Sequence, residues 1–145
     1  SLHTPLLVRW PNRIKPQSKN NSLVSNLDFA PTFLELAGAK PRNDMQGKSL
    51  IPILKGAKPK DWRKTHYYHY YEAGGHGVPI HYGVTDGKEK LIRFPDANLN
   101  TWEFFDLGKD PLEMKNLYTD KSYTANIQSM KKELQRLRKQ YKIED

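Results

Sequence analysis

The stretch His81-Tyr-Gly-Val-Thr-Asp-Gly-Lys-Glu-Lys-Leu-Ile-Arg-Phe94 decides the fold of the second half of this chain. Asp86-Gly87 is the strongest short-range signal for a hairpin turn, because both residue types adopt positive φ at low cost. Residues 81–85 and 88–94 are therefore predicted to be antiparallel strands. Thr85-Asp86-Gly87 is assigned to this turn and not to a metal-binding motif.

Two further strands and a helix are predicted around this hairpin. Residues 65–72 form a dense run of tyrosine and histidine with high strand preference, and residues 101–106 precede a turn at 108–111. An amphipathic helix follows, with apolar residues at spacings of three and four: Tyr123, Ile127, Met130, Leu134, Leu137 and Tyr141. We expect a small antiparallel sheet with this helix covering one face, over residues 61–145.

The first 60 residues show a different pattern. Pro5-Leu-Leu-Val8 is a short apolar run of the kind found in strands buried on both faces of a mostly parallel sheet. Asp28 can cap a helix that ends at Gly38, and a second short helix is predicted within residues 47–56. We therefore expect residues 1–60 to be the end of an α/β core, which makes the chain α/β overall and α+β within itself.

Composition limits the classes of function. The 145 residues include no cysteine, which excludes disulfides, zinc-thiolate sites and a thiol nucleophile within them. No apolar run approaches the roughly 20 residues of a membrane helix. The net charge of +8 invites a polyanion partner, but much of the excess falls in the last segment, as it often does on a solvated helix face, and that explanation is favoured. Nucleic acid is disfavoured, since no recognition motif accompanies the charge.

Four stretches together resemble one enzyme family. Residues 3–11, 24–38, 47–54 and 102–117 are similar, in this order, to the carboxy-terminal third of the formylglycine-dependent sulfatases, which hydrolyse sulfate esters. The last of them reads Trp-Glu-Phe-Phe-Asp-Leu-Gly-Lys-Asp-Pro-Leu-Glu-Met-Lys-Asn-Leu. Residues 66–83 look closest to bacterial glycan sulfatases of the N-acetylglucosamine-6-sulfatase and iduronate-sulfatase-like group.

The resemblance implies an alkaline-phosphatase-like fold and a periplasmic or secreted parent enzyme. It also implies a nucleophilic formylglycine made from Cys or Ser, and a calcium ion held by Asp and Asn. Neither group can be placed in this chain, because the nucleophile motif and the metal motifs are missing. We predict no catalytic residue and no metal ligand here, and assign Asp106, Asp110 and Glu113 to turns and caps.

Candidate substrate residues come from the segment rich in histidine and tyrosine. Sugar sites combine flat apolar rings with hydrogen-bonding groups, and this segment carries both. The candidates are His69, Glu72, His76 and His81, the last two beside a glycine-rich loop. The alternative is that alternate residues of a strand simply face the helix and the solvent.

The sequence therefore predicts the carboxy-terminal part of a glycan sulfatase, which supplies substrate-pocket residues without the reaction centre. Its partners would be a sulfated carbohydrate and the upstream catalytic portion of the same protein. Apolar surface left on residues 5–8 and on the helix from Asp28 would also favour self-association. Two alternatives stay open: a non-catalytic module that binds sulfated polysaccharide, and part of a related phosphatase or phosphonate hydrolase.

Overall fold

A computed structural model describes residues 4–72, 77–96 and 98–143. The chain divides into two compact units, Ser1–Arg63 and Lys64–Asp145. Sequence patterning placed the division after residue 60. Trp62 and Arg63 belong to the first unit because their side chains bind within it: the Trp62 indole N–H donates to the Leu23 carbonyl at 2.9 Å, and Arg63 pairs with Asp28.

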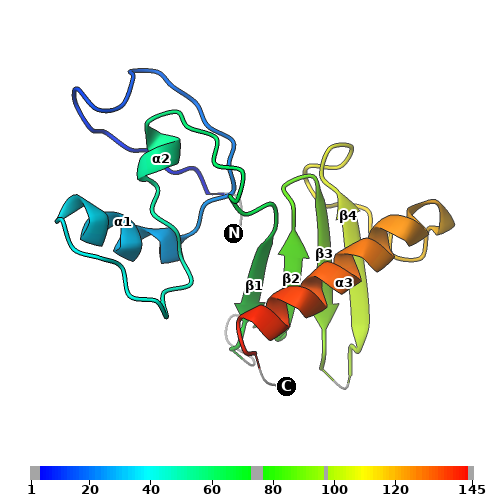
Figure 1. Ribbon diagram of the computed structural model, residues 1–145. Coiled ribbons are helices and arrows are strands. Elements are labelled where there is room, and N and C mark those ends of the chain that lie inside the picture. The colour runs from blue at the N-terminus through cyan, green and yellow to red at the C-terminus, as the bar shows by residue number, and fades with distance from the viewer. Residues whose placement is uncertain (1–3, 73–76, 97, 144–145) are drawn as a thin grey trace. The chain divides into compact units, whose positions relative to one another are not determined.

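The second unit is built on a four-stranded antiparallel sheet, as predicted. Its strands are β1 (His66–Tyr70), β2 (His81–Thr85), β3 (Glu89–Phe94) and β4 (Thr101–Asp106), adjacent in chain order (Figure 1). The turn between β2 and β3 confirms the Asp-Gly hairpin. Gly87 has a φ of 85°, and the Asp86 carboxylate accepts from the backbone N–H groups of Lys88 and Glu89 at 2.8 and 2.7 Å.

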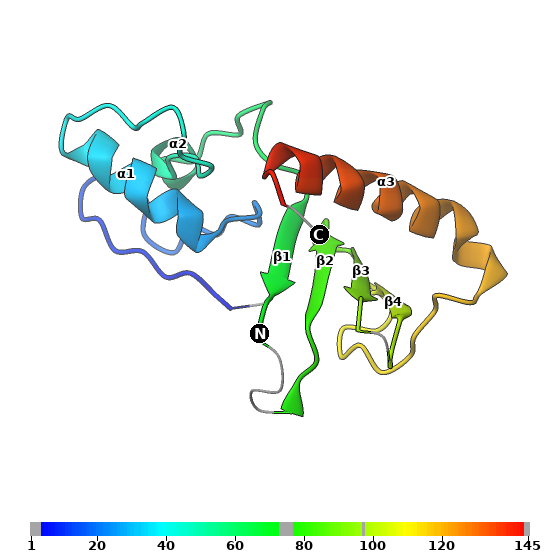
Figure 2. The ribbon, with the colours of Figure 1, turned by 90° about the horizontal axis from the view of Figure 1, so that it is seen from below.

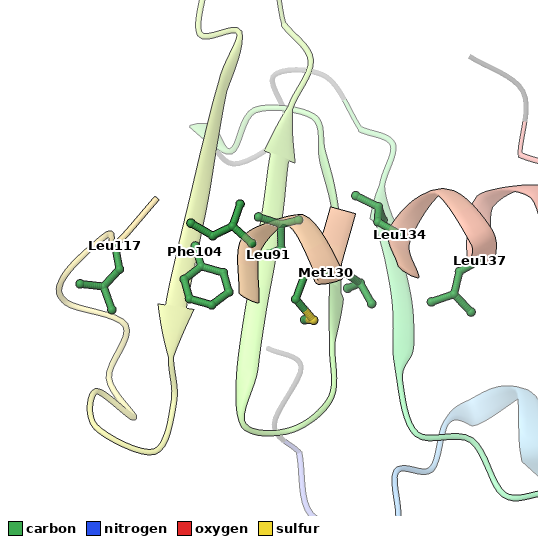
Figure 3. Packing of buried hydrophobic residues seen from close by; sticks show 8 residues of the cluster. Leu91, Phe104, Leu117, Met130, Leu134 and Leu137 are labelled. Carbon is green, nitrogen blue, oxygen red and sulfur yellow. The ribbon is translucent and has the colours of Figure 1, made fainter. Parts of the chain in front are cut away.

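Helix α3 (Thr124–Gln140) covers one face of this sheet (Figure 2). A 3-10 turn, η3 (Lys121–Tyr123), leads into it, and the Asp120 carboxylate caps that turn by accepting from the Ser122 N–H. The apolar core lies between helix and sheet, and Figure 3 shows its side chains pointing toward one another. Its buried members are Val84, Leu91, Phe104, Leu117, Ile127, Met130, Leu134 and Leu137.

Strand β4 is one of the two edge strands of the sheet, the other being β1, and the segment after β4 covers part of its edge. The Asn116 side-chain oxygen accepts from the Phe104 N–H at 3.0 Å, and its amide donates to the Trp102 carbonyl at 3.2 Å. The Leu117 N–H then donates to the Phe104 carbonyl at 2.8 Å. Since unpaired edge groups invite pairing with other chains, this segment protects the edge.

The first unit contains η1 (Asn26–Asp28), α1 (Phe29–Leu36) and α2 (Ile51–Leu54). A buried carboxylate joins its parts. Asp28 is fully buried and accepts from the Ser25 and Lys48 backbone N–H groups, each at 2.8 Å, and from the Arg63 guanidinium through both oxygens. Asp28 was expected to cap the helix after it, but its carboxylate instead binds groups before, after and far from that helix.

Pro5–Val8, predicted to be a strand of a larger sheet, forms no strand among the described residues. The segment has no secondary structure, and the Leu7 side chain is 91% exposed. A strand requires hydrogen bonds from a neighbour, and no strand of the first unit's described part offers them. The apolar face of α1 is likewise uncovered, with Phe29, Phe33 and Leu36 all exposed.

Candidate functional site

Aromatic rings gather around His81 at one end of the sheet of the second unit. The strand register pairs Tyr70 with His81, so both side chains lie on one face, the face opposite to helix α3. The His81 ring stacks on Tyr70 with centroids 5.4 Å apart, and it contacts Tyr68 at 5.7 Å and Phe94 at 5.4 Å. These four residues, which we call the His81 cluster, are all half-buried.

A glycine in β2 makes room for this cluster. A Cβ added at Gly83 would lie 2.8 Å from the Tyr68 ring and 2.4 Å from the Leu91 carbonyl oxygen. Only glycine therefore lets the Tyr68 ring lie across the strand. Burial, with the charges of Glu113 and Glu103, raises the pKa of Tyr68, so its hydroxyl stays protonated and can donate a hydrogen bond.

Hydrogen bonds orient two polar groups beside these rings. His81 Nδ1 lies 2.9 Å from the Pro79 carbonyl oxygen. Because a carbonyl oxygen can only accept, Nδ1 carries the proton, and in the neutral ring Nε2 is left as an acceptor. The exposed Glu72 carboxylate accepts from the Tyr70 hydroxyl at 3.3 Å. The arrangement combines flat apolar faces with outward hydrogen-bond acceptors, which suits a sugar ring.

His69 does not join this cluster. The register pairs it with Tyr82, and it therefore lies on the opposite face, toward helix α3. It shares a hydrogen bond with the Tyr67 hydroxyl at 3.0 Å and stacks on Tyr71 with centroids 3.7 Å apart. Burial, and then the charges of Arg138 and His81, lower the pKa of His69, which favours its neutral form. A pocket on either face alone would thus use one of the two histidines.

Comparisons with known proteins identify the family. The family described as N-sulphoglucosamine sulphohydrolase, C-terminal, matches residues 1–140. The chain belongs to this sulfatase family. An N-acetylglucosamine-6-O-sulfatase of Bacteroides thetaiotaomicron is 42% identical over 97% of this chain and 26% of its own length. The chain therefore spans about a quarter of that relative.

Solved structures confirm the fold of this sulfatase region. BT4656, solved in complex with its substrate D-glucosamine-2-N,6-O-disulfate, superposes with a TM-score of 0.90 and 41% identity, over 94% of this chain and 28% of that one. A phosphonate monoester hydrolase of Agrobacterium radiobacter is more distant, with a TM-score of 0.65 and 25% identity over 79% of this chain and 24% of its own. The alkaline-phosphatase-like assignment made from the sequence is thereby confirmed.

The acidic residues singled out in this sulfatase region serve turns and one partly buried ion pair. Asp106 accepts from the Gly108 and Lys109 N–H groups, Asp110 accepts from the Lys115 N–H, and Glu113 pairs with Lys90 at 2.6 Å. No group of three or more metal-ligating side chains occurs in the part of the chain that the structure describes. Within the same residues, no helix is long and apolar enough to cross a membrane. His76 lies outside the described residues.

Phe94 is the member of the His81 cluster that sequence reasoning missed. Counting outward from a two-residue Asp-Gly turn would pair His81 with Ile92, whereas the observed register pairs Tyr82 with Arg93 and so brings the next residues, His81 and Phe94, side by side. Tyr68 and Tyr70 were recognised only as part of an aromatic run. Their alternation with His69 would have separated the two faces, and with them His69 from His81.

Proposed function

We propose that this chain is the carboxy-terminal part of an enzyme that hydrolyses sulfate esters of sulfated glycans. The observation that carries the proposal is the TM-score of 0.90, over 94% of the chain, with a sulfatase solved on a sulfated glucosamine. The reacting groups would lie in the upstream portion, and this chain would bind and orient the sugar.

The parent enzyme would use a formylglycine nucleophile and a calcium ion, as the family resemblance implies. The residues of this chain do not fit either group, because the sequence has no cysteine and no serine in the nucleophile motif, and the described residues hold no cluster of metal ligands. This chain's contribution would therefore be to substrate binding. A parent that acts on extracellular glycans would be periplasmic or secreted.

The substrate residues we propose are those of the His81 cluster, with Glu72 beside it and His76, which lies between β1 and β2 in the sequence. The stacked rings offer apolar faces, while His81 Nε2 and the Glu72 carboxylate accept from sugar hydroxyls. His69 would act indirectly from the other face, through the Tyr71 ring that stacks on it.

The upstream portion of the protein is the partner we propose for the first unit. Leu7, Phe33 and Leu36 leave 91%, 67% and 47% of their surfaces exposed, which is costly for residues of this size. An upstream sheet would cover them and supply the neighbours that Pro5–Val8 lacks. Without that cover, the same surface would drive self-association.

Kinetics of the complete enzyme test the role of the His81 cluster. His81→Ala should raise KM for N-acetylglucosamine 6-sulfate about tenfold, the effect of losing about 1.4 kcal/mol of binding. Turnover of a small aryl sulfate, which has no sugar hydroxyls, should stay near wild type. His66→Ala, which removes a histidine at the other end of β1, is the matched control and should change both values less than twofold. Equal losses on both substrates with His81→Ala would contradict the assignment.

A phosphonate or phosphate hydrolase is the second candidate, favoured by the superposition on the Agrobacterium enzyme. The two functions differ in the ester that the upstream nucleophile attacks. Comparing kcat/KM for matched aryl sulfate and aryl phosphonate monoesters separates them. A higher value for the phosphonate would replace the sulfatase proposal.

A further inference from the structure

A row of side chains crosses the sheet of the second unit on the side of helix α3. The register pairs His69 with Tyr82, Tyr82 with Arg93, and Arg93 with Trp102, so these four residues form one line over all four strands. We call it the cross-sheet row. Because neighbouring strands lie about 4.8 Å apart, the row is about 14 Å long, more than one sugar ring. All four side chains are half-buried.

Two cations from helix α3 lie over this row. Lys131 Nζ lies 4.7 Å from the centroid of the Trp102 ring and 4.9 Å from that of Tyr118, whose ring is nearly parallel to Trp102. The Arg138 guanidinium lies 4.3 Å from the centroid of Tyr82. Arg93, within the row, lies 5.2 Å from the centroid of Trp102. Three cations are therefore held against aromatic faces along one line.

The cationic side chains of Arg93 and Lys131 donate their hydrogen bonds to uncharged acceptors. Arg93 donates to the Thr101 carbonyl and the Asn100 side chain, and Lys131 donates to the Tyr118 hydroxyl. Among the described residues, no ion pair includes either of them. Arg has five N–H donors and Lys three, so both keep donors to offer. By contrast, Arg136 on the same helix is paired with Glu133 at 2.7 Å.

We propose that the cross-sheet row, with Lys131, Arg138 and Tyr118, binds a sulfated segment of an oligosaccharide. Sulfate groups accept hydrogen bonds from cations, so the three cations along the row match the charged part of such a ligand. The row and the His81 cluster lie at the same end of the sheet on opposite faces. The row would therefore hold a part of the glycan other than the sugar at the His81 cluster. It shares with the proposed function only the class of ligand.

Binding of a heparin-derived octasaccharide to the full 145-residue chain tests this proposal. Isothermal titration should give an affinity for Arg93→Gln/Lys131→Gln that is about tenfold weaker than for the wild type. Arg136→Gln/Lys132→Gln removes the same charge from the exposed part of α3 and should weaken binding less than twofold. Thermal unfolding establishes that each variant is folded. If the double variant fails to fold, Lys131→Gln against Lys132→Gln makes the same comparison.

Two competitors separate sugar recognition from simple charge attraction. Desulfated octasaccharide and single-stranded DNA of matched charge should each bind at least about tenfold more weakly than the sulfated ligand. Equal weakening by the two double variants would overturn the proposal, as would DNA binding with the same affinity and the same dependence on Arg93 and Lys131. Sulfatase turnover does not enter either readout, so failure here and failure of the proposed function are distinguishable.

Discussion

Each of the two units of this chain is stabilised internally by a different kind of interaction. The second unit has a conventional apolar core of eight buried side chains between a helix and a sheet. The first unit buries few large apolar residues, chiefly Leu50, Ile51 and Ile53, and centres on the ion pair of Asp28 with Arg63. The contrast teaches that apolar burial makes the second unit self-sufficient, while the first depends on polar contacts and leaves apolar surface uncovered.

The largest expected effect is in the apolar core. Phe104→Ala should lower the free energy of unfolding of the second unit by about 3–5 kcal/mol, because the ring is fully buried between β4 and α3. Urea denaturation, followed by hydrogen exchange in residues 101–106, measures it. Unchanged exchange in residues 26–36 would show that the two units unfold separately. Loss of protection in both units would show that they unfold together, which would contradict the comparison.

Breaking the ion pair should lower the free energy of unfolding of the first unit by about 3 kcal/mol. Arg63→Met leaves the buried Asp28 carboxylate without its cation, and an uncompensated buried charge is strongly destabilising. Exchange in residues 26–36 is the measurement. The matched control is Asp28→Leu/Arg63→Met, which removes both charges and should recover part of the loss. A single variant as stable as the wild type would show that the pair contributes nothing.

Acid should destabilise the first unit by removing the contribution of Asp28. Burial by itself would raise the pKa of Asp28, but the Arg63 side chain and the Lys48 and Ser25 N–H groups outweigh it and lower that pKa below the usual 3.8. A carboxyl with a depressed folded pKa stabilises fully above its unfolded pKa and loses this contribution as pH falls through the folded pKa. Hydrogen exchange in residues 26–36 between pH 5 and pH 2 checks this; exchange that stays unchanged over that range would refute it.

A smaller effect is expected at the protected sheet edge. Asn116→Ala removes the hydrogen bonds to the Phe104 N–H and the Trp102 carbonyl and should cost about 1 kcal/mol in unfolding free energy. Since the edge of β4 becomes available, aggregation at high concentration should also rise. Light scattering with urea denaturation measures both, and Asn126→Ala on the exposed side of α3 is the control.

The smallest effect is expected at a surface pair of the first unit. Arg42 and Asp44 form a salt bridge at 2.7 Å, but their side chains are 76% and 66% exposed. Solvent screens such a pair, so Asp44→Asn should leave the free energy of unfolding of the first unit unchanged within experimental error. Hydrogen exchange in residues 26–36 measures the effect. A measurable loss of unfolding free energy would mean that exposed polar contacts also stabilise the first unit.

The contrast between the units also explains what could be predicted from the sequence. The hairpin at Asp86-Gly87 and helix α3 depend on turn chemistry and on helical periodicity, which are local, and both predictions are confirmed. Asp28 and Arg63 are 35 residues apart, and no local sequence pattern predicts that they pair. Pro5–Val8 forms no strand among the described residues because a strand is defined by its neighbours. His69 and His81 were grouped because composition ignores the alternation of faces, which only the register fixes.

The most direct test of the account is an assay of sulfate release by the 145-residue chain alone. The chain is expected to bind sulfated sugar but to release no sulfate from N-acetylglucosamine 6-sulfate or an aryl sulfate above the enzyme-free rate, even after treatment with a formylglycine-generating enzyme. Sulfate release that follows the purified chain through successive columns would contradict the central claim, because the reaction centre would then lie within these residues.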